Sequence, residues 1–193
     1  IAGVTVSSVS IHNEDYIKEK DLRFGDSVLI ERAGDVIPQI VKSLAAVRTG
    51  KEKKIRFPVY CPVCKSKLSK ENEEAVWRCT NIECPAQTLE RIRHFTSKDA
   101  MDIRGFGDAT IRKLFDSGLM INIPGIYKLD YKKIAKLEGF GEKAIGNLKK
   151  AVSNSKNQPL HRLIYAFGIR FVGQTTAKTL ANSVNHLLEF QNY

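Results

Sequence analysis

The sequence has few cysteines and no long hydrophobic run. Among its 193 residues are four cysteines, two methionines and one tryptophan. Without a stretch of about 20 apolar residues the chain is not expected to cross a membrane. It also has no secretory leader, which argues against an oxidising compartment and a disulfide framework. Its hydrophobic content of 42% is ordinary for globular proteins, and its length suffices for more than one folded unit.

The sequence has fewer acidic than basic side chains. The chain carries 31 lysines and arginines against 21 acidic residues, a net charge of +10, and the basic excess falls after residue 50. A cationic surface spread over several elements favours a polyanionic partner, most often nucleic acid. The alternative is a basic protein whose lysines are merely solvated.

The cysteines form two close pairs, spaced C-x2-C-x14-C-x4-C: Cys61 with Cys64, and Cys79 with Cys84. Two turns that each supply two thiolates across a short loop suit a tetrahedral zinc ion. We call residues 60–85 the knuckle; it has few large apolar side chains, so a metal would provide its rigidity. Trp77 is expected to pack within it. Two disulfides are the alternative, and a catalytic zinc is disfavoured because four thiolates leave no open position.

The first 50 residues have the pattern of β-strands. Strands are predicted over residues 4–9, 27–32 and 36–41, with turns at 25–26 and 33–35. Two or three strands cannot close a barrel. We therefore expect part of a small β-barrel whose opening strands precede this sequence.

From residue 88 onward the periodicity is helical, with no convincing strand. Three glycines, Gly107, Gly141 and Gly173, lie 34 and 32 residues apart. Each has an apolar residue four positions before it, an aliphatic residue four positions after it and a leucine seven positions after it. Matched offsets in three copies indicate an internal repeat.

Each repeated glycine follows an apolar residue. The copies read Gly105-Phe106-Gly107, Gly139-Phe140-Gly141 and Phe171-Val172-Gly173. Such a turn between amphipathic helices buries the apolar residue and exposes backbone N–H groups where the second helix begins. Those donors, with the helix dipole, can hold a phosphate without reading a base. The repeat therefore predicts hairpins that hold a duplex backbone.

Three other interpretations of the repeat stay open. Gly-x-Gly also begins the dinucleotide fingerprint, but no strand precedes it here and the motif recurs. A period near 34 fits tetratricopeptide arrays, whose Trp and Leu-Gly pattern is missing. The glycines could be helix stops only, which leaves the paired glycines before a helix start unexplained.

Several segments together resemble the C-terminal half of bacterial NAD-dependent DNA ligases. They are Val-Ser-Ile-His-Asn at 9–13, Gly-Asp-Ser-Val at 25–28, Arg-Ala-Gly-Asp-Val-Ile-Pro at 32–38, the Cys-Pro-Val-Cys and Cys-Pro-Ala-Gln segments, Ala-Met-Asp-Ile at 100–103 and Gly-Ile-Arg-Phe-Val-Gly at 168–173. The resemblance spans nearly the whole chain. One departure is Lys65, where the family usually has glycine; another is that the family has four hairpin motifs and usually a BRCT domain.

This resemblance implies a multidomain fold. A partial β-barrel of the OB-fold type is expected over residues 1–50, a four-cysteine zinc finger with its linker over 51–87, and an all-α helix-hairpin-helix domain over 88–193. The last domain would hold three motifs and a truncated fourth.

The resemblance also implies a function. The family seals nicks in duplex DNA through an enzyme–AMP intermediate formed from NAD, with Mg, by the lysine of a Lys-x-Asp-Gly motif in an N-terminal nucleotidyltransferase domain. That tetrad does not occur here, so no catalytic residue is expected and the chain should be inactive alone. Its expected partners are nicked duplex DNA and that N-terminal domain, in the bacterial cytoplasm. The alternative is a stand-alone zinc and helix-hairpin-helix DNA-binding repair module without ligase activity.

The predicted sites are a structural zinc centre and a DNA-binding surface. The zinc ligands are the four cysteines. The expected DNA contacts are Gly105, Gly107, Gly139, Gly141, Arg170, Val172 and Gly173 in the helical half, and His12, Asn13 and Arg32 in the OB portion.

Overall fold

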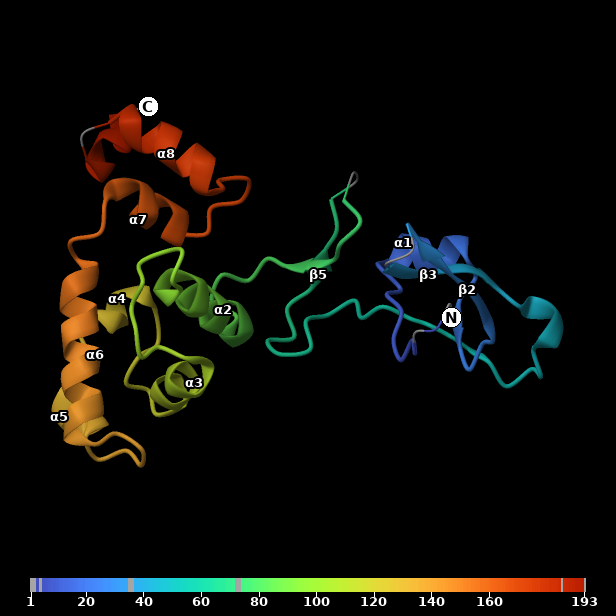
Figure 1. Ribbon diagram of the computed structural model, residues 1–193, viewed down its shortest axis with the longest axis horizontal. Helices are drawn as coiled ribbons and strands as arrows, with labels where there is room; N and C mark the ends of the chain where they lie inside the picture. Colours follow the sequence, from blue (N-terminus) through green and yellow to red (C-terminus); the bar gives the residue numbers. More distant parts are fainter. Residues whose placement is uncertain (1–2, 4, 35–36, 72–73, 185, 193) are drawn as a thin grey trace. The chain divides into compact units, whose positions relative to one another are not determined.

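Contacts among its residues divide the chain into two units, Ile1–Asn81 and Ile82–Tyr193. The structure is a computed structural model that describes residues 3, 5–34, 37–71, 74–184 and 186–192 (Figure 1). Among the described residues, no helix has both the length and the apolar character needed to span a bilayer.

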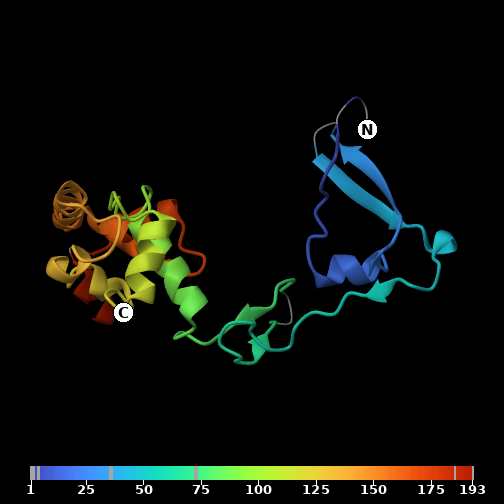
Figure 2. The ribbon, with the colours of Figure 1, turned by 90° about the horizontal axis from the view of Figure 1, so that it is seen from below.

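The longest strands of the N-terminal unit, β2 (Val28–Ala33) and β3 (Ile37–Ser43), pair antiparallel (Figure 2). The register shifts between Leu29 and Ile30, as at a β-bulge, which bends and twists the ribbon locally. Shorter antiparallel pairs join β1 (Arg23–Phe24) to β4 (Lys53–Lys54) and β5 (Leu68–Ser69) to β6 (Arg78–Cys79). A 3-10 segment, η1, covers Ala45–Val47.

A short helix, α1 (Glu14–Glu19), packs against this ribbon. Ile17 and Leu22 form a small buried cluster with Ile40 of β3, and the Tyr16 hydroxyl donates a hydrogen bond of 2.6 Å to the Ile40 carbonyl oxygen. The sequence analysis did not predict α1. Its signals were an N-cap asparagine, two acidic residues in the first turn and a lysine in the last.

The strands predicted over residues 27–32 and 36–41 correspond to β2 and β3. The strand predicted over residues 4–9 is wrong for the part that the structure describes, because residues 5–10 have no regular structure. An extended segment becomes a strand only when its backbone pairs with a neighbour, and none of the sheets among the described residues includes this one. Val4, Asp35 and Val36 lie outside the described residues.

The C-terminal unit is helical, and its described residues contain no strand. Its elements are α2 (Pro85–Thr96), α3 (Asp108–Asp116), α4 (Ile123–Ile126), α5 (Tyr131–Ile134), α6 (Glu142–Ser155), α7 (Leu160–Ala166), α8 (Gln174–Asn182) and the 3-10 segment η2 (Leu187–Asn192). Proline occupies the first position of α2, where its missing N–H costs no intrahelical bond.

One apolar core joins helices α2 to α7 of this unit. Ile92 and Phe95 of α2 contribute to it, with Ile111 and Leu114 of α3 and Leu148 of α6, all almost fully buried. Helices α7 and α8 pack side by side near the C-terminal end (Figure 1). This core fixes the loops that precede α3 and α6, where the repeated glycines lie.

Candidate zinc centre and nucleic-acid interface

The four cysteines meet at one place in the knuckle. Their sulfur atoms all lie within 4.8 Å of one another, and the sulfurs of Cys64 and Cys79 are 3.5 Å apart. None of the cysteines is in a disulfide. A tetrahedral zinc with Zn–S bonds of about 2.3 Å places its sulfurs about 3.8 Å apart. Donor type, number and spacing therefore fit zinc.

The first cysteine pair sits on a tight turn. The Cys61 N–H donates to the Ser66 carbonyl at 2.8 Å, and the Lys65 N–H donates to the Cys61 carbonyl at 3.0 Å. Lys65 has a φ of +61°, the left-handed conformation that glycine adopts without steric cost. This turn geometry explains why glycine suits the position. Here the lysine keeps the turn, and its ammonium donates to the Pro62 carbonyl at 2.9 Å.

The electrostatics of the metal-free thiols also favour a cation. Hydrogen bonds from the Ser66 hydroxyl and N–H lower the pKa of the Cys64 thiol to about 6. The Asn81 N–H lowers the pKa of Cys79, but desolvation and the neighbouring Cys64 outweigh it and raise that pKa to about 12. Close thiols resist joint ionisation because thiolates repel one another. A divalent cation would remove this repulsion.

The three repeated glycines have nearly the same backbone conformation. Each is the N-cap of a helix: Gly107 of α3, with φ −73° and ψ 167°; Gly141 of α6, with φ −76° and ψ 168°; and Gly173 of α8, with φ −79° and ψ 179°. We call residues 103–107, 137–141 and 169–173 the first, second and third turns. Each helix therefore begins with its free N–H groups at the end of a turn of one design.

The hydrogen bonds within the turns repeat as well. In each copy the residue before the N-cap glycine donates its N–H to the carbonyl three positions earlier: Phe106 to Ile103 at 3.4 Å, Phe140 to Leu137 at 3.2 Å and Val172 to Ile169 at 3.0 Å. The residue two positions before the N-cap has a positive φ in all three: Gly105 at 92°, Gly139 at 87° and Phe171 at 64°. The turns are thus copies in geometry as well as in sequence.

The glycines have two different surroundings. A Cβ added to Gly107, Gly141 or Gly173 would have no atom within 4 Å, so the backbone there is open to a ligand. A Cβ on Gly105 would lie 3.2 Å from Cδ1 of Leu148. The N-cap glycines are open on the surface, whereas Gly105 is packed against α6.

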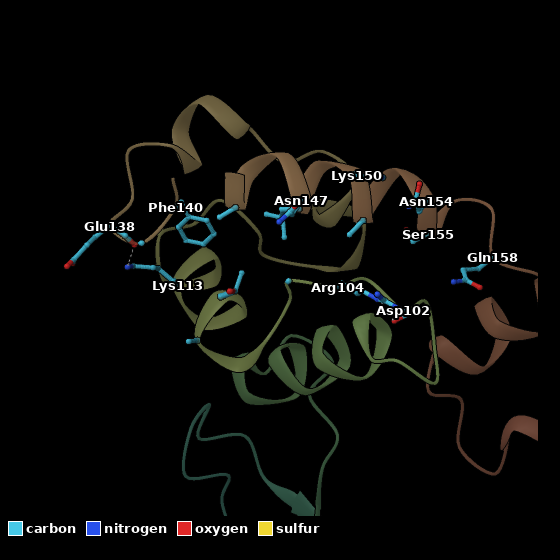
Figure 3. A pocket seen from close by; sticks show the side chains of 17 residues that line it. Asp102, Arg104, Lys113, Glu138, Phe140, Asn147, Lys150, Asn154, Ser155 and Gln158 are labelled. Carbon is cyan, nitrogen blue, oxygen red and sulfur yellow. Dashed lines mark hydrogen bonds and ion pairs between the residues drawn. The ribbon is translucent and has the colours of Figure 1, made fainter. Parts of the chain in front are cut away.

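A groove of about 850 Å³ lies between the first two turns (Figure 3). Gly105 and Gly139 line it, and the Lys113 ammonium of α3 donates a hydrogen bond to the Glu138 carbonyl at its edge. Helix α6 lines the groove with Asn147, Lys150 and Asn154. They are spaced three and four residues apart and so lie on one face of the helix. The sequence analysis missed these residues and Lys113, although that spacing was a signal for the three on α6.

The residues predicted for the OB portion lie at the start of α1 and on β2. Asn13 caps α1, since its side-chain oxygen accepts the Tyr16 N–H at 2.9 Å. His12 has a φ of +50° and its ring lies 4.7 Å from that of Tyr16. Arg32 lies on β2 opposite Pro38. In the helical unit, Val172 and the predicted glycines lie in the three turns, which share one geometry. Arg170 lies in the third turn.

The N-terminal unit combines antiparallel strand pairs with the short helix α1, the knuckle holds four clustered cysteines, and the helical unit repeats a glycine turn. Together these features define a multidomain protein of the zinc-finger class. Residues 1–52 match the OB-fold domain of NAD-dependent DNA ligases, and residues 60–86 match their C4 zinc finger domain. Over 193 residues the chain is 61% identical to a DNA ligase of Persephonella marina and 58% identical to one of Sulfurihydrogenibium azorense; over 192 residues it is 55% identical to one of Aquifex aeolicus.

These alignments cover 100% of the chain but only 27% to 28% of the relatives. Over its whole length the chain is similar to part of these DNA ligases, and it spans a little over a quarter of the length of the curated relatives it matches.

Proposed function

We propose that this chain is the DNA-holding portion of an NAD-dependent, nick-sealing DNA ligase. In this proposal the reaction uses NAD and Mg bound by a nucleotidyltransferase domain of the same polypeptide. Residues 1–50 act as an OB-fold that contacts DNA through His12, Asn13 and Arg32, and residues 51–87 form the zinc finger. Residues 88–193 form a helix-hairpin-helix domain that holds the duplex near the nick.

The observation that carries the proposal is the common geometry of the three turns. Each ends in an exposed N-cap glycine with open space where a side chain would be. The first N–H groups of α3, α6 and α8 therefore face solvent next to backbone that a phosphate can approach closely. Such contacts position a duplex without reading its sequence.

The charge and the groove support the same function. A net charge of +10 favours a polyanion, and the groove between the first two turns carries Lys113, Lys150 and Arg104. The amide side chains of Asn147 and Asn154 add uncharged donors. We infer that phosphates on one strand lie along this groove.

The cysteine cluster supports a structural role for zinc. When bound, the metal would cross-link the two halves of the knuckle through Cys61, Cys64, Cys79 and Cys84 and neutralise their thiolates. Four thiolates complete a tetrahedral shell, so no position is left for a substrate. The zinc would thus hold the knuckle in shape and would not take part in the ligation reaction.

The sequence contains no Lys-x-Asp-Gly tetrad. Covalent catalysis requires an activated nucleophile, so the chain should neither form an AMP adduct nor seal a nick alone. Added to an N-terminal nucleotidyltransferase fragment of the same polypeptide, it should restore sealing. It should change the DNA-independent adenylation step little, because holding the nick supplies proximity only to the later steps.

The test is gel-resolved nick sealing beside radiolabelled adenylation, with each fragment alone and with both together. Sealing by the pair and not by either fragment supports the proposal. Adenylation by this chain alone would overturn the division of roles. If the pair gives no sealing while this chain still binds duplex DNA, a DNA-binding repair module becomes the better description.

A further inference from the structure

The third turn differs from the other two at one position. Two residues before the N-cap glycine, the first and second turns have Gly105 and Gly139, and the third has Phe171. All three positions have a positive φ. Glycine adopts this conformation freely, whereas a side chain with a Cβ is strained there. Phe171 is therefore held in an unfavourable backbone conformation that glycine would relieve.

Nothing in the fold uses the Phe171 ring as core. The residue is 85% exposed, the largest exposure among the large hydrophobic residues that the structure describes. Ile169 in the same turn is 51% exposed, whereas its counterpart in the first turn, Ile103, is buried. The ring's close neighbour is the Arg170 guanidinium, 4.5 Å from the ring centroid. A strained and solvent-exposed aromatic residue points to a function outside the fold.

The surroundings of the third turn indicate the kind of ligand. Next to the start of α8 is a cavity of about 300 Å³, lined by Lys98, His161, Arg162, Gln174 and Lys178 together with Asp99 and Tyr165. Cations there can neutralise phosphates. An apolar tip beside a basic surface matches the chemistry of a duplex groove, where sugars and base edges lie between two rows of phosphates.

We propose that Phe171 is a DNA-contacting residue whose ring enters a groove of the duplex and packs on sugars and base edges, while Arg170 and the basic cavity hold the flanking phosphates. This inference rests on the proposed function. It assigns to the third turn an apolar contact that the first two turns, with glycine at this position, cannot make.

In this proposal the ring contributes to DNA affinity, and the strained backbone lowers the stability of the fold. Removing the side chain should therefore raise stability and lower DNA affinity. Phe171→Gly should raise the midpoint of thermal unfolding of the helical unit by about 2–4 °C, because the left-handed strain is relieved. The same variant should bind nicked duplex about tenfold more weakly, because an aromatic side chain no longer leaves water. Phe171→Asn should behave alike, since asparagine tolerates a positive φ, whereas Phe171→Tyr should retain binding.

The experiment measures binding of the zinc-loaded chain to a nicked duplex by fluorescence anisotropy, from about 50 to 200 mM salt. The loss in Phe171→Gly should be the same factor at every salt concentration, because an apolar contact releases no counterions. Arg170→Gln should instead reduce the slope of log affinity against log salt by about 1. Ile121→Ala is the matched control, since Ile121 is 63% exposed and lies in none of the three turns.

Equal duplex affinity for wild type, Phe171→Gly and Phe171→Asn would overturn the inference, and so would a loss seen only with single-stranded DNA. If wild type itself does not bind the duplex, the proposed function fails instead. A thermal midpoint that rises in Phe171→Gly with weaker binding supports both the strain and the contact.

Discussion

The indole Nε1 of Trp77 in the knuckle donates a hydrogen bond of 2.6 Å to the carboxylate of Glu14, 63 residues earlier on α1. Lys70 and Asp15 form a second link at 2.8 Å between the same segments. Trp77 was expected to pack within the knuckle. Its indole N–H links the knuckle to α1 within the N-terminal unit.

This contact should depend on pH. Hydrogen bonds from Lys18 and then Trp77 hold the pKa of Glu14 below its ordinary value. A group whose pKa is lowered by folding contributes stability above its unfolded pKa, and loses it as the pH falls through the folded pKa. Trp77 is the chain's only tryptophan, so its fluorescence should change at a pH below the ordinary glutamate range.

The measurement is tryptophan emission between about pH 7 and pH 3 for wild type and Glu14→Gln. The variant keeps an acceptor oxygen but cannot titrate. Both proteins keep the four cysteines, so acid release of zinc is common to them and the difference isolates Glu14. Superimposable curves would contradict the prediction.

The sequence predicted the parts of the fold that local rules determine. The repeat of Gly107, Gly141 and Gly173 was enough to predict where three helices begin. An N-cap and the apolar residues that follow it are close in sequence, so the signal is local. The cysteine spacing likewise predicted a metal centre, because each close pair can supply two thiolates to one ion.

The features that the sequence did not reveal depend on distant partners. The segment at 5–10 has valines at 6 and 9, but β-branched residues do not supply the neighbouring backbone that a strand needs. The hydrogen bond from Lys113 of α3 to the Glu138 carbonyl of the second turn joins residues 25 positions apart. The positive φ of Phe171 was hidden because the residue type argues against it.

Zinc should bind at one ion per chain, with Zn–S distances of about 2.3 Å. Cys79→Ser should release it and loosen the knuckle, because the remaining thiolates cannot complete the shell. The helical unit should keep its fold, since Ile92, Phe95 and their neighbours form its own core. Metal analysis, X-ray absorption and circular dichroism test these points. Loss of all helical signal would disprove the independence.

DNA affinity should be nearly independent of base sequence and should fall steeply with salt. Backbone N–H groups and lysines contact phosphates, which are the same in every DNA sequence. Each phosphate that is neutralised releases counterions, so binding weakens as salt increases. Titrations of several unrelated duplexes across a salt series measure both properties. A marked preference for one sequence at moderate salt would contradict binding through backbone contacts.

The open N-cap glycines allow a clean test of phosphate approach. Gly107→Ala and Gly141→Ala should leave the fold intact, because an added Cβ meets no atom within 4 Å and the φ values suit any residue. Each should weaken DNA binding, because the methyl group occupies the space that the phosphate approaches.

Gly146→Ala is the matched control for these substitutions. Gly146 lies inside α6 with the same open space around an added Cβ, and alanine should stabilise the helix there by about 1 kcal/mol. DNA affinity should not fall in this variant. Affinity that drops equally in all three would mean that the methyl groups act through the fold and not through the turn.

The last prediction concerns the hydrogen bond between α3 and the second turn. The Lys113 ammonium donates to the Glu138 carbonyl, and the next residues of that turn include Phe140, whose N–H is bonded to Leu137. Lys113→Met keeps the aliphatic stem but removes the donor, at a cost of about 1 kcal/mol for one hydrogen bond. Local opening of the second turn should become easier, and hydrogen exchange at the Phe140 amide should accelerate about fivefold. Lys149→Met is the control, because Lys149 is exposed on α6 but does not line the groove. Exchange at Phe140 that is unchanged in Lys113→Met, or equally faster in both variants, would show that the second turn does not depend on this bond.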